Sequence, residues 1–341
     1  MSTFSAQHRL IPAALEAVST ACAVSRAIQA NLHQLRQVTK DDRSPVTVAD
    51  FAVQAIVALS LADQLPESDR LIVGEEDAKE LRSNEQSAIR AAVLEAVRTW
   101  RPQITEEEML HAIDGCDHDG SSDGYFALDP IDGTKGFLRG QHYAIALGRI
   151  ENGKVVAGVM GCPNLSIDQS FPLHEIDPCG VVYAASGGAG AWEFADCDAT
   201  TTPMRIVAQQ FDESRPLRFC ESAEKGHSNR GDSELIIEAV GTPGEPARLD
   251  SQCKYTLVAR GQADGYLRLP TSKEYVEKIW DHAAGVCIAT EAGAIVSDVS
   301  GNPLDFTHGT RLEQNRGVIC ATDGLHQRII ATIQELAIAQ G

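Results

Sequence analysis

The sequence is poor in positive charge. It carries 29 Lys and Arg residues against 48 Asp and Glu residues, so its formal net charge is −19 at pH 7. A surface this acidic repels polyanions, which makes nucleic acid polymers and anionic membranes poor partners. We interpret most of these acids as a solvated surface.

Long apolar runs and paired cysteines are also missing. No apolar run approaches the roughly 20 residues that a membrane span needs. The N-terminus shows no basic-then-apolar pattern, so we expect a cytoplasmic protein without a cleaved leader. The nine cysteines form no CxxC pair, which argues against a zinc or thioredoxin-like site. Their surroundings are those of reduced thiols packed in a cytosolic enzyme.

Length and composition are those of an ordinary globular protein. The 341 residues are 43% hydrophobic and 23% charged. A chain of this length forms one large domain or two medium ones. We place a boundary in the Pro- and Asp-containing segment 171–180, which divides the chain into residues 1–178 and 179–341.

Hydrophobic periodicity predicts helices and strands along the whole chain. Helices are expected over 5–38, 51–65, 85–99, 233–240, 254–260, 280–291 and 325–339. Strands are expected over 71–73, 125–128, 143–150, 154–160, 181–185, 217–220, 265–269, 294–299 and 317–321. Asn152-Gly153 predicts a hairpin turn. Thr47 and Asp50 resemble a capping box at the start of the second helix.

The most informative segment is Asp129-Pro130-Ile131-Asp132-Gly133-Thr134. Hard divalent cations need several oxygen ligands, and Asp129, Asp132 and the carbonyl of Ile131 could supply three of them. Gly133 and Thr134 are expected to begin a helix, whose unpaired N–H groups attract phosphate. The segment therefore predicts a phosphoryl-transfer site, although Asp, Pro and Gly together are also typical of a surface turn.

Three further acidic segments favour the metal interpretation. They lie at 40–47 (KDDRSPVT), 73–76 (VGEE) and 279–285 (IWDHAAG). In this order the four segments resemble the inositol monophosphatase superfamily of magnesium-dependent, lithium-sensitive phosphatases. Within this superfamily, four segments resemble the 3′(2′),5′-bisphosphate nucleotidase branch in sequence. They are 133–140 (GTKGFLRG), 224–228 (EKGHS), 250–255 (DSQCKY) and 266–270 (YLRLP).

The resemblance runs from about Leu10 to the last predicted helix and implies both a fold and a metal site. The fold would be an α/β one, with an α+β first half and an α/β second half in a layered α-β-α-β-α sandwich. Two or three magnesium ions would be bound by a ligand set drawn from both halves. The implied ligands are Glu75, Asp129, the Ile131 carbonyl, Asp132 and Asp281. Four carboxylates this close would repel one another without cations.

The resemblance also assigns roles in catalysis. Asp42 matches the position that helps to activate water, and the Thr134 hydroxyl could relay a hydrogen bond between Asp42 and that water. Thr134 and Asp281 each have a simpler interpretation, which is that of a helix N-cap.

Further residues match positions that hold the nucleotide. Gly133 and Thr134 would offer N–H groups to the phosphate, and the imidazole of His227 could stack on adenine. Lys254 and Arg268 could neutralise the phosphate that is not cleaved, with Ser251 beside them. Taken singly, side chains of these kinds are more often surface residues or structural partners.

The implied activity is hydrolysis of the 3′-phosphate of adenosine 3′,5′-bisphosphate to AMP and phosphate. The branch also implies use of 3′-phosphoadenylyl sulfate. One alternative is hydrolysis of inositol phosphates, and an alternative from another class is a nucleotide-binding sensor without turnover. We expect a small-molecule nucleotide as the partner and a monomer as the working form.

Overall fold

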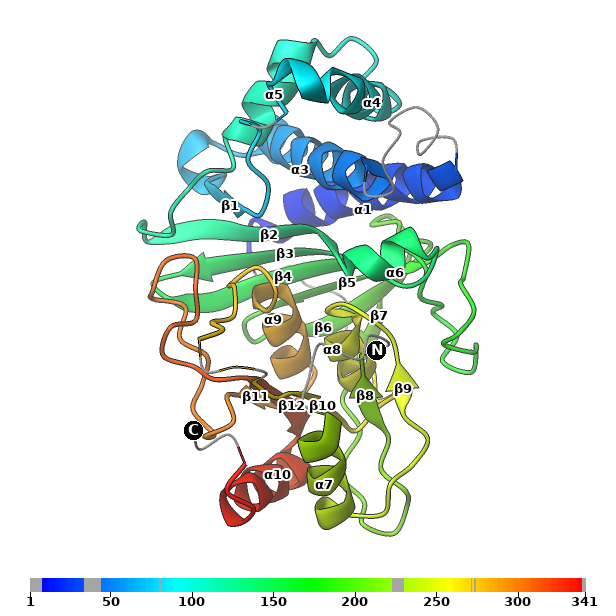
Figure 1. Cartoon of the computed structure of the whole chain (residues 1–341), viewed down its shortest axis with the longest axis vertical. Helices are drawn as coiled ribbons and strands as arrows, with labels where there is room; N and C mark the ends of the chain where they lie inside the picture. The colour runs from blue at the N-terminus through cyan, green and yellow to red at the C-terminus, as the bar shows by residue number, and fades with distance from the viewer. Residues whose placement is uncertain are drawn as a thin grey trace.

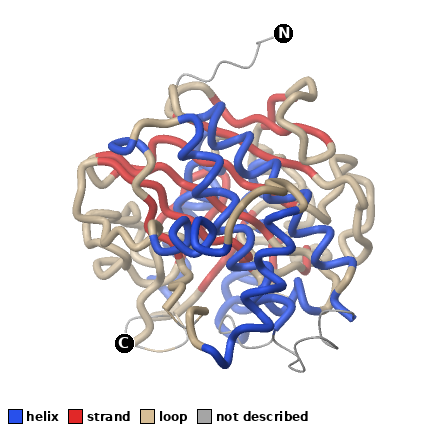
Figure 2. The backbone as a smooth tube through the Cα atoms, turned by 90° about the horizontal axis from the view of Figure 1, so that it is seen from above, coloured by secondary structure: helices blue, strands red, loops and turns tan. Residues whose placement is uncertain are grey.

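The computed structural model of the chain describes residues 8–33, 44–79, 81–222, 230–270, 272 and 274–338. Its elements stack in five layers, in the order helix, sheet, helix, sheet, helix (Figure 1). This confirms the layered α/β sandwich that the resemblance implied. The view from above shows the helices lying over the strands, with the loops gathered at the sides (Figure 2).

The first layer is helical and contains the two longest helices. Its helices are α1 (Ile11–Ala30), α3 (Ser44–Gln64), α4 (Ser87–Arg98) and α5 (Glu106–Asp114). Short 3₁₀ turns, η1 (Glu67–Asp69) and η2 (Asn84–Gln86), lie between α3 and α4. α3 begins seven positions before its predicted start, so Thr47 and Asp50 lie inside the helix and the predicted capping box is wrong.

α1 is long and apolar enough to cross a membrane by length and composition, contrary to the sequence expectation that no segment approaches this. In the fold, its apolar side chains are buried in the same core as those of α3 and the first sheet. Core helices are often as long and as apolar as this one.

The second layer is a seven-stranded sheet in the order β1-β2-β3-β4-β5-β6-β7. Within this sheet β1 and β2 pair in parallel, and each later pair of neighbours is antiparallel. The strands are β1 (Ile72–Gly74), β2 (Gly124–Asp132), β3 (Ala144–Glu151), β4 (Lys154–Cys162), β5 (Val181–Ser186), β6 (Gly190–Ala195) and β7 (Met204–Ile206). The boundary expected after residue 178 falls inside this sheet, between β4 and β5. If each sheet defined one half of the chain, the boundary would fall after β7, between residues 206 and 219.

Side chains on both faces of this sheet are buried. Ile145 and Leu147 of β3 face the core of the first layer, and Ala144 and Ala146 face the core on the other side. This follows from the alternation of side chains along a strand, with apolar residues at each of positions 144–147. The predicted hairpin between β3 and β4 is confirmed, with positive φ at both of its turn residues, Asn152 and Gly153.

The third, fourth and fifth layers complete the sandwich. The second sheet has the order β11-β12-β10-β8-β9, from β8 (Phe219–Glu221), β9 (Ala247–Arg248), β10 (Gly265–Arg268), β11 (Ala294–Ser297) and β12 (Val318–Thr322). Helices α8 (Cys253–Ala259) and α9 (Ala283–Glu291) lie between the two sheets, and α7 (Arg230–Val240) and α10 (Asp323–Glu335) cover the far side (Figure 1).

α9 approaches the first sheet closely because two strand positions are glycine. A Cβ on Gly148 would lie 2.5 Å from the Cβ of Ala283, and one on Gly158 would lie 2.8 Å from the carbonyl oxygen of Ala284. Larger residues on either side would push the helix away. The close packing carries Asp281, two residues before α9, toward the carboxyl end of β2.

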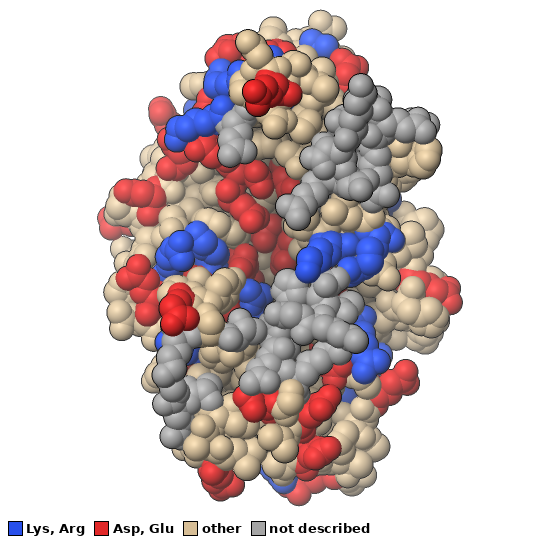
Figure 3. All heavy atoms as spheres, viewed as in Figure 1, with Lys and Arg blue, Asp and Glu red and all other residues tan. Residues whose placement is uncertain are grey.

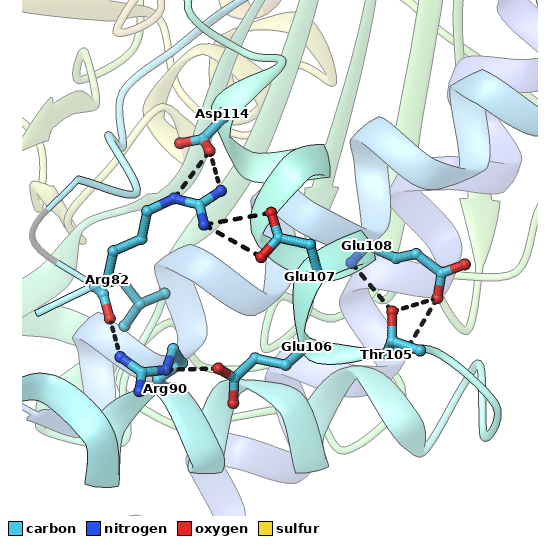
Figure 4. A network of polar contacts seen from close by, with 8 residues as sticks. Arg82, Arg90, Thr105, Glu106, Glu107, Glu108 and Asp114 are labelled. Atoms are coloured by element: carbon cyan, nitrogen blue, oxygen red, sulfur yellow. Dashed lines mark hydrogen bonds and ion pairs between the residues drawn. The ribbon is translucent and has the colours of Figure 1, made fainter. Parts of the chain in front are cut away.

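Several elements are absent from the sequence prediction, among them α5. A capping box begins this helix: Thr105 Oγ1 accepts from the N–H of Glu108 (3.2 Å), and the N–H of Thr105 donates to Glu108 Oε2 (2.8 Å). Arg82 binds Asp114 and Glu107 of α5, as Figure 4 shows together with the box and the neighbouring Arg90–Glu106 pair. These pairs attach the segment after β1 to the outer helices.

Candidate active site

One cavity of about 480 Å³ brings the predicted site residues together. Every predicted residue in the described part of the chain lines it: Glu75, Asp129, Ile131, Asp132, Gly133, Thr134, Ser251, Lys254, Arg268 and Asp281. Asp42 and His227 lie outside the described residues. Figure 3 shows acidic side chains gathered in a hollow in the middle of this face, with basic side chains on both sides.

A β-bulge aims two carboxylates at the same space. β2 runs through Asp132, so the strand predicted to end at residue 128 continues through both carboxylates. Asp129 pairs with Ala146 and Asp132 with Ala144, which leaves two residues of β2 opposite one residue of β3. Residues three apart in a regular strand point to opposite faces, and the extra residue of a bulge cancels that difference. Pro130, which has no N–H to donate, suits such an irregular position.

Asp129 is the most enclosed of these acids. Its side chain is 3% exposed, and its Oδ1 has no hydrogen-bond partner within the described part of the chain. Burial raises the pKa of Asp129, and the charges of Glu75, Asp132 and Asp281 raise it further. A buried carboxylate oxygen without a donor is strongly destabilising unless a cation satisfies it. The residues therefore fit a metal ion.

Glu75 and Asp281 complete what we call the acidic cluster, together with Asp129 and Asp132. Both side chains reach solvent through the cavity, yet protein atoms surround their carboxylates. Burial and the charges of Glu76 and Asp132 raise the pKa of Glu75 to about 7. Burial and the charge of Asp132 raise the pKa of Asp281 to about 7, against the opposing effects of His282 and Arg268. Both shifts have the direction that nearby positive charge would oppose.

Gln54, which the sequence analysis missed, holds the segment that carries Glu75. Its side chain is fully buried in α3. Its Nε2 donates to the carbonyl oxygen of Glu76 (2.8 Å), and its Oε1 accepts from the N–H of Glu76 (3.1 Å). A Cβ on Gly74 would lie 2.7 Å from Gln54 Oε1, so this approach needs glycine there. The clamp fixes the end of β1 against the helical layer.

Asp50 adds a fifth carboxylate beside the acidic cluster. It lies one turn before Gln54 in α3 and is 8% exposed. Burial raises the pKa of Asp50, followed by the charges of Glu76 and Glu75, and its own charge contributes to the raised pKa of Asp129. An acid and an amide four residues apart, on one face of an apolar helix, are the sequence signal that could have found it.

Gln252 joins the two halves of the site. Its backbone N–H donates to Asp132 Oδ2 (2.6 Å). Its side chain donates to the carbonyl oxygen of Trp280 (2.9 Å) and accepts from the N–H of Gly285 (3.3 Å). The segment that carries Asp281 is therefore attached to the residue that binds Asp132.

Gly133 and Ser251 meet where the two halves approach each other. Gly133 has φ of 93°, and a Cβ there would lie 3.0 Å from the Cβ of Ser251. Ser251 itself has φ of 73°, an unusual value for a residue with a side chain. The helix expected after Gly133 is confirmed as α6 (Thr134–Leu138), with Thr134 exposed at its start. Only glycine at 133 allows both the turn and the contact.

Lys254 lies on α8 with its side chain buried along one wall. Its Nζ donates to the carbonyl oxygens of Ser251 (2.7 Å) and Leu249 (3.5 Å) and lies 5.2 Å from the centroid of the Tyr266 ring. Burial lowers the pKa of Lys254. An ammonium group has three N–H donors, so it retains capacity for a ligand in the cavity.

Arg268 is the last residue of β10 and also lines the cavity. Its Nε donates to Glu277 Oε1 (2.9 Å), and its Nη2 lies 2.7 Å from Glu277 Oε2 and 3.6 Å from Asp281 Oδ2. The burial of Glu277 raises its pKa, but the hydrogen bond with His282 and the charges of His282 and Arg268 outweigh this and lower it to about 2.

Glu277, Asp281 and His282 also have ligand atoms within 4.8 Å of one another, a spacing that could hold a metal ion. Arg268, however, already occupies both oxygens of Glu277. We therefore regard Glu277 and His282 as the support of Arg268, and Asp281 as a member of the acidic cluster.

Comparisons with known proteins agree with this geometry. A model of the inositol monophosphatase family matches residues 6–337. A curated 3′(2′),5′-bisphosphate nucleotidase of Schizosaccharomyces pombe is 44% identical over 304 residues, covering 86% of this chain and 84% of the relative. One from Oryza sativa is 40% identical over 337 residues, covering 95% and 93%. Mycobacterium tuberculosis SuhB shares the fold, with a TM-score of 0.60 at 22% identity over 96% of both chains.

Proposed function

The chain belongs to the inositol monophosphatase family, whose members are metal-dependent, and we propose that it hydrolyses the 3′-phosphate of adenosine 3′,5′-bisphosphate. Water attacks phosphorus, the bond from phosphorus to the 3′ oxygen breaks, and AMP and phosphate leave. The similarity to curated bisphosphate nucleotidases over most of the chain carries the proposal. The sulfated analogue 3′-phosphoadenylyl sulfate presents the same 3′-phosphate and is a second expected substrate.

The acidic cluster and the carbonyl of Ile131 would hold two or three Mg²⁺ ions. Such ions supply Lewis-acid polarisation of the phosphoryl group and neutralise charge on the attacking and leaving oxygens. The unpartnered Oδ1 of Asp129, deep in the cavity wall, supports this ligand set. The bulge in β2 and the clamp by Gln54 hold the carboxylates of the first sheet at fixed places before any ion arrives.

Removal of a proton from the attacking water needs a base within reach. Two carboxylates are candidates: Asp42 and Asp50. Asp42 is the candidate that the resemblance gives. Asp50 lies beside the acidic cluster but not among the residues that line the cavity, so it would act on the water only through another group. The exposed hydroxyl of Thr134 is available to orient the water or a phosphate oxygen.

The far side of the cavity would hold the rest of the nucleotide. Lys254 and Arg268 provide the positive charge for the phosphate that is not cleaved, and Ser251 contributes the adjoining wall. Gly133 and Thr134 would donate N–H groups to the scissile phosphate, and His227 would stack on the base. Charge supports the direction of approach, since basic residues flank an otherwise acidic hollow (Figure 3).

We further propose a monomeric cytoplasmic enzyme that acts on small nucleotides and on neither nucleic acid polymers nor membranes. The net charge of −19 supports this, because it opposes contact with polyanions. Light scattering of the purified protein tests the oligomeric state.

A substrate panel tests the proposal. Phosphate release is measured with adenosine 3′,5′-bisphosphate, 3′-phosphoadenylyl sulfate and inositol 1,4-bisphosphate, each with Mg²⁺ and with Mg²⁺ plus Li⁺. We expect the two nucleotides to be cleaved, the inositol substrate to be cleaved less well, and lithium to inhibit. Cleavage of inositol 1,4-bisphosphate alone would overturn the nucleotide assignment, and binding without any release would indicate a sensor.

A further inference from the structure

A buried chain of hydrogen bonds stands behind Arg268. Both Nε and Nη2 of Arg268 contact the carboxylate of Glu277, at 2.9 and 2.7 Å. Glu277 Oε2 also lies 3.2 Å from His282 Nε2, and His282 Nδ1 lies 2.8 Å from the hydroxyl oxygen of Tyr255. This series of hydrogen bonds thus leads from the cavity wall into the interior. Its side chains come from β10, from the segment before α9, and from α8.

The directions of these hydrogen bonds follow from the groups involved. An ionised carboxylate only accepts, so the Nε2–H of His282 donates to Glu277. Nδ1 of His282 is bonded to the hydroxyl of Tyr255 in either state of the ring: it accepts from the hydroxyl in a neutral imidazole and donates to it in a charged one. Each group beyond Arg268 therefore has a partner that fixes its orientation.

The inner members of the chain are rigidly enclosed. His282 and Tyr255 are fully buried, and Glu277 is 5% exposed. A Cβ on Gly285 would lie 2.3 Å from the Tyr255 ring, and the Tyr266 ring packs edge-on against it at 5.1 Å. The ring of Tyr255 has no room to turn, so its hydroxyl is a fixed anchor for His282.

Arg268 is different because it is the member that meets the cavity. Its side chain is 23% exposed, and the half-exposed Tyr275 accepts from its Nη2 (3.2 Å) at the rim. A guanidinium has five N–H donors, so the two bonds to Glu277 set its plane and still leave donors for a ligand. Two bonds to one carboxylate also remove most of the freedom of a long side chain.

We propose that Glu277, His282 and Tyr255 are positioning residues that hold Arg268 for the phosphate that is not cleaved, and so select bisphosphorylated substrates. This rests on the proposed function and adds the origin of its selectivity. A phosphate contact by a preorganised guanidinium loses less entropy on binding than one by a mobile side chain. The three residues act through Arg268 and touch no reacting atom.

The test compares two substrates that differ by one phosphate. Adenosine 3′,5′-bisphosphate has the phosphate that Arg268 would hold, and adenosine 3′-monophosphate lacks it. We expect Glu277→Gln to raise KM for the bisphosphate about tenfold, the value of one charge-assisted contact, and to change KM for the monophosphate less than about twofold. Tyr255→Phe, which removes only the hydroxyl, should give a smaller rise of the same kind, about threefold.

Two controls define the interpretation. In an Arg268→Ala background, Glu277→Gln should have no further effect on KM, because the residue that it positions is gone. Asp264 offers the matched buried pair: it lies just before β10, is 1% exposed, and pairs with Arg215 away from the cavity. Asp264→Asn should lower the melting temperature and leave the ratio of the two KM values unchanged.

Equal changes for both substrates in Glu277→Gln and Tyr255→Phe would overturn the inference, as would no change in either. If the wild-type protein cleaves neither nucleotide, the proposed function fails, and calorimetry with AMP still decides the positioning role. An unchanged Kd for AMP in Glu277→Gln would refute it, and a Kd about tenfold weaker would support it.

Discussion

The backbone N–H of Gln252 donates a hydrogen bond of 2.6 Å to Oδ2 of Asp132. One partner ends the bulged strand β2, and the other precedes α8 beside the second sheet. The bond therefore sets the distance between the first-sheet carboxylates and the residues proposed to hold the nucleotide. It also orients Asp132 and leaves its other oxygen for the cavity, which the side chain lines.

Asp129 should be unfavourable for the stability of the metal-free protein. Because Asp129→Asn replaces a buried acid whose Oδ1 has no hydrogen-bond partner among the described residues, we expect it to raise the melting temperature without metal by about 2–4 °C, equivalent to roughly 1 kcal/mol. Mg²⁺ should raise the melting temperature of the wild type and leave the variant nearly unchanged. Calorimetric scans with EDTA and with Mg²⁺ measure both effects. A variant that melts lower than the wild type in EDTA would contradict the account of this residue.

The metal-free protein should lose stability as the pH rises. Glu75 and Asp281 have folded pKa values of about 7, above the ordinary carboxyl values of about 4. The folded state therefore binds more protons than the unfolded state between roughly pH 4 and pH 7, so its stability falls across this window as the pH increases.

Urea unfolding at several pH values in EDTA measures that slope. The double variant Glu75→Gln, Asp281→Asn should flatten it, because its amides do not titrate. A slope that persists unchanged in the double variant would show that other groups cause it.

The clamp by Gln54 should matter for metal affinity. Gln54→Met keeps most of the side-chain volume and removes both hydrogen bonds of Gln54 to the backbone of Glu76, so we expect the free energy of unfolding to fall by about 1–3 kcal/mol. Apparent Mg²⁺ affinity, read from the metal-dependent rise in melting temperature, should weaken about tenfold or more because Glu75 is no longer held.

Arg82→Met is the matched control for Gln54, since Arg82 secures the same segment from outside (Figure 4). Its partners are exposed or half-buried, so we expect this change to lower the free energy of unfolding by less than about 1 kcal/mol. Similar losses of Mg²⁺ affinity in both variants would refute a special role for the buried clamp.

Gly148 should tolerate no side chain. Gly148→Val would drive its Cβ into Ala283 and push α9, and Asp281 with it, from the first sheet. We expect the free energy of unfolding to fall by about 1–3 kcal/mol or more, and Mg²⁺ to stabilise the variant less than the wild type. Gly187→Ala is the control, because the nearest atom to its Cβ would be 3.9 Å away. Urea unfolding compares the two, and equal stability of both variants would contradict the packing argument.

The sequence predicts much of the acidic cluster because its members lie in short sequence motifs. Asp129, Asp132 and Gly133 belong to one short segment, and Glu75 follows a strand that its apolar residues predict. All of them line one cavity in the structure. The roles assigned to them, and to Asp42 and His227, stay predictions.

Other features depend on contacts between distant residues, which no local pattern contains. Asp50 fits a capping box in the sequence, but the earlier start of α3 puts it inside a helix facing Glu75 and Glu76. The bulge in β2 appears only through its pairing with β3. β7 and β9 are three and two residues long, too short to show any periodicity.

Phosphate release from adenosine 3′,5′-bisphosphate, measured over a series of Mg²⁺ concentrations for the wild type and Asp129→Ala, tests the central claim most directly. The account predicts turnover by the wild type that requires Mg²⁺, and none by the variant at any Mg²⁺ concentration. Near-normal turnover by Asp129→Ala in excess Mg²⁺ would contradict it, because the acidic cluster would then not be the site of the reaction.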